Sequence, residues 1–82
     1  MSHRGPFADI WFTLAGKGYV DVTVATHRVD ALIETIKKRK WRQNVRRRKQ
    51  GMRPYEDMII STVKLSDAYV KVTFQIPQRY VV

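Results

Sequence analysis

A dense group of positive side chains in the middle of the chain has the clearest chemical potential in this sequence. Ten of the sixteen lysines and arginines fall between residues 37 and 53, and no acid interrupts them: Lys37, Lys38, Arg39, Lys40, Arg42, Arg46, Arg47, Arg48, Lys49 and Arg53. The rest of the chain carries six cations against seven acids, so the net charge of +9 belongs to this basic segment, residues 37–53. Such a concentration of like charge is typical of a surface that binds a polyanion.

The residue types within the basic segment favour nucleic acid as that polyanion. Guanidinium groups bind phosphate through two hydrogen bonds and stack on bases. Trp41 can stack on an unpaired base, and the amides of Gln43 and Asn44 can read base edges. We therefore expect an RNA or DNA interface, in an accessory or regulatory protein, formed by Lys37, Lys38, Arg39, Lys40, Trp41, Arg42, Gln43, Asn44, Arg46, Arg47, Arg48, Lys49 and Arg53.

Other readings of the basic segment remain open. It can dock on the acidic surface of a host enzyme and modulate that enzyme, as a small viral or mobile-element protein would, or it can be a solvated face that binds nothing. Trp41 can pack against Val45, which follows it at helical spacing. A membrane is disfavoured as partner, because an interfacial helix needs bulky apolar residues and the segment offers Trp41 and Val45.

Residues suited to catalysis or metal binding do not cluster in the sequence. The chain has no cysteine, and its two histidines, His3 and His27, are far apart. The pair Glu56 and Asp57 is read as a counter-charge beside the basic segment, and Gly16-Lys17-Gly18 as a hairpin turn. We expect no metal, no cofactor and no enzymatic activity. The absence of cysteine favours the cytoplasm.

The elements that must position the basic segment are predicted from hydrophobic periodicity. Alternation over residues 9–26, with Ile10, Phe12 and Leu14 inward, predicts a β-hairpin that turns at 15–18. A period of 3.6 follows from Thr26, the expected N-cap, and predicts a helix that Gly51 ends. The apolar stripe of this helix stops after Ile36, so we expect it to leave the core past about residue 40. Repulsion between its cations predicts that residues 41–51 are frayed until a partner binds.

A second predicted hairpin completes the chain. Its first strand runs from about 58 to 65, with Ile59, Val63 and Leu65 on one face, and its second strand alternates from Tyr69 to Ile76. The expected fold is α+β in the order ββαββ, a four-stranded antiparallel sheet with one amphipathic helix packed on one face. It would be a single domain over residues 8–82 after a flexible lead at 1–7. The bare sheet face, with Trp11 and Tyr69, leaves open an aromatic platform or a homodimer.

Overall fold

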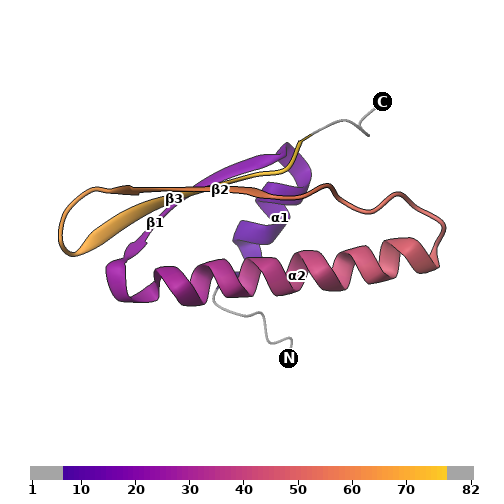
Figure 1. The fold of residues 1–82 in the computed structure, drawn as a ribbon, viewed down its shortest axis with the longest axis horizontal. Helices are drawn as coiled ribbons and strands as arrows, with labels where there is room; N and C mark the ends of the chain where they lie inside the picture. The colour runs from indigo at the N-terminus through magenta and orange to yellow at the C-terminus, as the bar shows by residue number, and fades with distance from the viewer. Residues whose placement is uncertain (1–6, 78–82) are drawn as a thin grey trace.

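Residues 7–77, which a computed structural model describes, form an α+β fold of two α-helices and a three-stranded antiparallel sheet (Figure 1). The elements are α1 (Ala8–Lys17), β1 (Tyr19–Ala25), the 3₁₀ turn η1 (Thr26–Arg28), α2 (Val29–Lys49), β2 (Ile59–Lys64) and β3 (Tyr69–Gln75). The predicted α+β class is confirmed. The ββαββ order and the fourth strand are wrong, because the first predicted strand is a helix. Most of the predicted lead at 1–7 lies outside the described residues.

The helix α1 replaces the first predicted strand because its sequence satisfies two periodicities. Ile10, Phe12 and Leu14 alternate as in a strand, whereas Phe7, Trp11 and Leu14 also have the i, i+4, i+7 spacing of a helix. The helical arrangement buries Trp11, which keeps 2% of its surface exposed, and the alternating one would have placed it in solvent. Burial of the larger aromatic side chain therefore decides the local structure.

Gly18 ends α1 and is not part of a hairpin turn. Its φ of 87° lies in the left-handed region that glycine adopts without strain, and its N–H donates to the carbonyl of Leu14 at 2.7 Å. The predicted N-cap Thr26 is also wrong. Arg28 precedes α2, and the Thr26 hydroxyl donates instead to the carbonyl of Asp67 at 2.9 Å. Gly51, with φ of 74°, follows α2 where the helix was predicted to end.

The sheet has β3 at its centre and buries one face. β1 and β2 both pair antiparallel with β3, in the order β1-β3-β2, so β1 and β2 run parallel to each other. Val72 and Phe74 of β3 are fully buried and belong to one cluster with Leu32 and Ile36 of α2 and Leu14 of α1. The predicted inward face of the last strand is thereby confirmed, as is the predicted helix face that covers it.

The sequence analysis placed Ile59 and Val63 on one face of β2 without deciding which way that face points, and in the structure it points away from the helices. Ile60 lies opposite Phe74, so Ile60 faces the helices. Ile59 and Val63 therefore point to the other side of the sheet, where both are about half exposed. One residue of register separates the two arrangements, and pairing with β3 selects the one observed.

The path of the chain makes α2 extend past the sheet. Since β1 and β2 are parallel, the chain must return along the whole sheet between them. At about 1.5 Å per residue the 21 residues of α2 span about 31 Å, whereas the seven residues of β1 span about 23 Å. Figure 1 shows the end of α2 beyond the sheet and residues 50–58 running back over it to β2.

The helical assignment of α1 makes a testable distinction between two neighbouring aromatic residues. We expect Trp11→Ala to lower the free energy of unfolding by about 3–5 kcal/mol, because it empties part of the core. Phe12→Ala should lower it by about 1 kcal/mol or less, since Phe12 is 54% exposed. Urea denaturation of the two variants measures both values. A strand at this position would reverse their order, and that result would contradict the structure.

Candidate nucleic-acid interface

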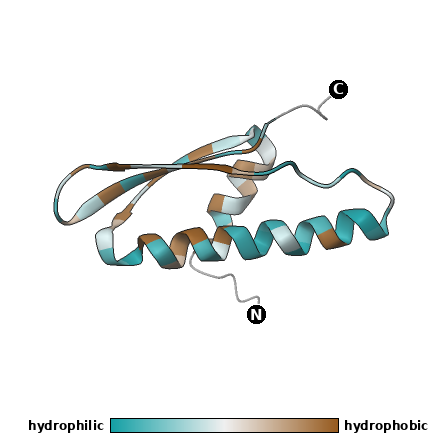
Figure 2. Ribbon diagram, viewed as in Figure 1, coloured by the Kyte–Doolittle hydropathy of each residue, from teal (hydrophilic) through white to brown (hydrophobic). Residues whose placement is uncertain are grey.

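The second half of α2 carries most of the basic segment, and Figure 2 shows it as almost wholly hydrophilic, with a single hydrophobic band. The hydrophobic bands of α2 otherwise gather in the half that lies under the sheet. The cations therefore occupy the part of the helix that the hydrophobic core does not cover. The reason is that the apolar stripe of α2 stops early: Leu32 and Ile36 are its buried apolar residues, and none follows them.

Asn44 fixes residues 50–58 against the helix. The side chain keeps 8% of its surface exposed, and its Oδ1 accepts a hydrogen bond from the Tyr55 N–H at 2.7 Å. Its Nδ2 donates to the Tyr55 carbonyl at 3.3 Å. The amide thus satisfies both polar backbone groups of Tyr55, as a neighbouring strand would. Asn44 was expected to read base edges, but both ends of its amide are already bonded within the protein.

Arg47 strengthens the same attachment. Its Nε donates to the carbonyl of Arg53 at 2.7 Å, and its guanidinium carbon lies 4.4 Å from the centre of the Tyr55 ring. The Tyr55 ring in turn meets Trp11 edge to face, with centroids 5.6 Å apart and an interplanar angle of 86°. We name this group, Trp11, Asn44, Arg47 and Tyr55, the loop anchor. Arg47 therefore belongs to the scaffold as well as to the basic segment.

The loop anchor bears on two expectations about α2 past residue 40. The helix leaves the hydrophobic core there, as expected, because Ile36 is its last core residue, but Asn44 is buried and Arg47 half-buried against residues 53–55. Residues 41–51 were expected to be frayed until a partner binds; the structure has regular helix through Lys49, and their mobility stays a prediction. Polar contacts take over where the apolar stripe ends. Hydrophobic periodicity does not register such contacts.

The outward side of the helix forms the candidate interface. Lys38, Arg42, Arg46 and Lys49 are exposed there, and Trp41 keeps 66% of its surface in solvent. Trp41, Arg42, Val45, Arg46 and Lys49 line a shallow hollow of about 280 Å³. Trp41 is therefore next to Val45, as its spacing suggested, but it remains largely open to a ligand.

A second hollow lies between α2 and the beginning of β2. It is a cleft of about 330 Å³, lined by Lys37, Lys40, Trp41, Asn44, Asp57, Met58 and Ile60. Trp41 thus borders both hollows. The walls combine an aromatic ring, two apolar side chains, two ammonium groups, one amide and one carboxylate, a mixture found in sites for small polar ligands.

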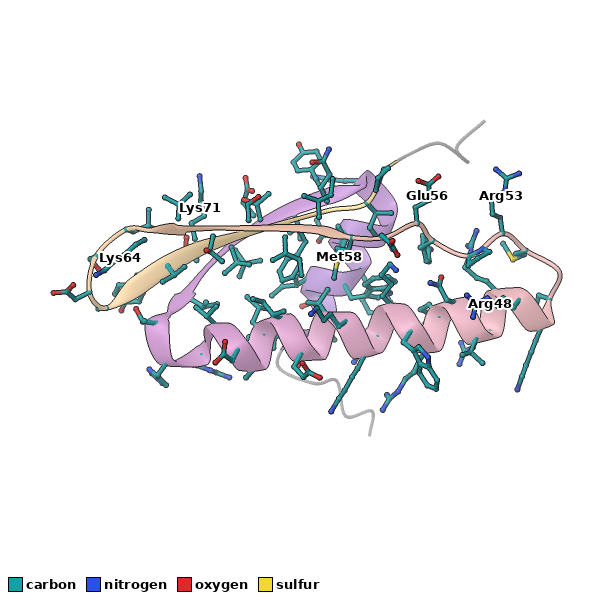
Figure 3. The ribbon with its side chains drawn as sticks, viewed as in Figure 1. Arg48, Arg53, Glu56, Met58, Lys64 and Lys71 are labelled. Carbon is teal, nitrogen blue, oxygen red and sulfur yellow. The ribbon has the colours of Figure 1, made fainter. Side chains whose placement is uncertain are left out.

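The other predicted interface residues surround this region. Arg39 and Gln43 are half-buried on α2, while Arg48 and Arg53 are exposed near its C-terminal end. Figure 3 shows Arg48 and Arg53 at the same end of the molecule, with Arg53 pointing away from the helix, and Lys64 at the opposite end. The cations are gathered in space as well as in sequence.

The ion pair found in the described part of the chain lies away from the basic segment. Among residues 7–77, the ion pair found joins Lys64 to Asp67 at 3.1 Å, in the turn between β2 and β3. None of the ten cations of the basic segment takes part in it.

The outer sheet face carries a patch of half-exposed apolar and aromatic side chains, only part of which was predicted from the sequence. Cross-strand pairing puts Tyr19, Ile59, Val63 and Tyr69 on this side, and each is about half exposed. Tyr69 was expected there, and it lies there. Trp11 was expected with it, but it belongs to α1 and is buried in the hydrophobic core. Strand alternation finds such residues only when the strands themselves are correctly assigned.

Comparison of the chain with family models, with curated proteins and with solved structures gave no match in any of the three. Over residues 7–77, neither helix is both long and apolar enough to cross a membrane. Within the same residues, no three His, Asp or Glu side chains are grouped as metal ligands would be.

The loop anchor can be tested through Asn44. We expect Asn44→Ala to lower the free energy of unfolding by about 1–3 kcal/mol, because it removes both hydrogen bonds between the Asn44 amide and the partly buried backbone of Tyr55. Hydrogen exchange at the Tyr55 amide should become fast in this variant. Arg46→Ala, an exposed change two residues along the same helix, is the matched control and should alter neither quantity. Unchanged protection of Tyr55 in Asn44→Ala would show that the anchor does not depend on the amide.

Proposed function

We propose that this protein binds nucleic acid through the exposed side of α2, as an accessory or regulatory module. The observation that carries the proposal is the group Lys38, Arg42, Arg46 and Lys49, which surrounds an exposed tryptophan and has no ion pair among residues 7–77. A surface of this composition neutralises phosphates with its cations and offers a ring to bases.

The scaffold supports this function by presenting the cations on a rigid element. The loop anchor holds the end of α2 in helical form despite repulsion between neighbouring like charges. The helical backbone therefore sets the spacing of these residues before a partner arrives, and less backbone conformational entropy is lost on binding. The absence of enzymatic activity stays a prediction.

Trp41 favours nucleic acid over an acidic protein as the partner. Burial usually stabilises a tryptophan, yet this one lies in solvent between cationic side chains. Bases have flat π-faces that stack on such a ring with any sequence, whereas the carboxylates of an acidic protein gain nothing from it. An acidic protein surface is the competing outcome of the experiment below.

We expect the purified protein to bind oligonucleotides with a strong dependence on salt. Contact with five to seven phosphates would give a slope of log K against log salt of about −4.5 to −6 on duplex DNA. Changing Arg42, Arg46 and Lys49 together to alanine should make the slope shallower by about 2 to 3. Fluorescence anisotropy at several salt concentrations measures the slopes. Arg47 is left intact because its loss would disturb the loop anchor.

The matched control changes Lys17, Lys64 and Lys71 to alanine, which also lowers the formal charge from +9 to +6. We expect this variant to keep a slope close to that of the original protein, because these lysines lie outside the basic segment. Equal losses in the two variants would mean that net charge alone attracts the ligand. Absence of binding at low salt, together with a stoichiometric complex with an acidic protein, would overturn the proposal in favour of the competing one.

A further inference from the structure

The cleft between α2 and β2 differs from the hollow on the outward side of α2 in having a carboxylate and a second apolar wall that comes from outside the helix. Met58 and Ile60 contribute the apolar side chains and Trp41 the aromatic one. Phosphate groups alone would not need either, since they are bound by cations and N–H groups. A ligand that fills this cleft must therefore have a flat, partly apolar portion as well as negative charge.

The charged residues of the cleft restrict the ligand further. Lys37 and Lys40 stand one helical turn apart at its border, within reach of phosphates on either side of an inserted group. Asp57 is a carboxylate in a cleft that otherwise attracts anions. A carboxylate accepts hydrogen bonds and repels acceptor oxygens, so it favours a base that presents an amino group, such as cytosine or adenine, over uracil or thymine.

The geometry points to a site for one unpaired nucleobase with an exocyclic amino group, held in a single-stranded nucleic acid. The base would stack on Trp41 against Met58 and Ile60, donate from its amino group to Asp57, and leave its neighbouring phosphates to Lys37 and Lys40. The cleft volume of about 330 Å³ is at the small end of ligand sites and suits one base. This inference rests on the proposed function and adds the strand form and base class of the ligand.

Short single-stranded oligomers of cytosine and of thymine, and a duplex of equal length, test the inference in the full-length protein. We expect the cytosine oligomer to bind about tenfold more tightly than the thymine oligomer, and both single strands to bind more tightly than the duplex. Binding should quench tryptophan fluorescence, and the signal should come from Trp41, because Trp11 is buried. Trp41→Ala should weaken binding about fivefold to a hundredfold and remove most of the quenching.

Asp57→Asn separates base recognition from electrostatic attraction. Removing a negative charge should maintain or raise the affinity for every oligomer. The ratio of the affinities for cytosine and thymine oligomers should fall to about one, so that the preference disappears. Asp67→Asn removes the same charge from the distant β2–β3 turn and should leave the preference intact. Tyr69→Ala, which removes an exposed ring from the outer sheet face, is the control for Trp41.

Each contrary result overturns a definite part of the account. Salt-dependent binding without base preference, or with tighter binding of the duplex, would overturn the cleft site and leave the proposed function standing. Loss of affinity in Tyr69→Ala but not in Trp41→Ala would move the stacking surface to the outer sheet face and overturn the cleft. Failure of every oligomer to bind would overturn both the cleft and the proposed function.

Discussion

The antiparallel pairing of β3 with both of its neighbours governs the rest of the structure. Because β1 and β2 must then be parallel, the chain between them has to cross the full length of the sheet and come back into register. A helix of 21 residues is longer than this distance requires, so its end projects past the sheet. Residues 50–58 run back along the projecting end to reach β2. The projecting helix end, the loop beside it and the cleft between them all result from this one connection.

The projecting end is held by polar contacts, which leaves its remaining positions open to cations. The Asn44 side chain forms hydrogen bonds with the backbone N–H and carbonyl of Tyr55, and the Arg47 guanidinium lies over the ring of the same residue. No apolar stripe is then needed past Ile36. The arginines and lysines near the C-terminal end of α2 also interact favourably with the helix dipole, which offsets part of their mutual repulsion. Two inward side chains thus permit an unusual charge density around the rest of the helix.

The sequence predicted those elements whose periodicity is unambiguous. The core face of α2, its end at Gly51 and the hairpin of β2 with β3 follow from Leu32, Ile36, Val72 and Phe74 and from the glycine and turn residues. Residues 8–17 fit two periods at once, and only the tertiary burial of Trp11 separates them. The gathering of cations was visible in the sequence. The roles of Asn44 and Arg47 were not, because their partners in residues 53–55 are brought close by the tertiary fold.

The placement of charge along the molecule gives it a permanent electric dipole. The basic segment lies toward the projecting end of α2, and the remaining residues together carry a net charge of about −1. In the field of a polyanion a molecule with such a dipole experiences a torque before contact, which turns the projecting end of α2 toward the polyanion. Encounters with a polyanion of the kind proposed would therefore be oriented over distances of about a Debye length, roughly 10 Å at 0.1 M salt. For such a partner, added salt would act on the rate of productive association as well as on the lifetime of the proposed complex.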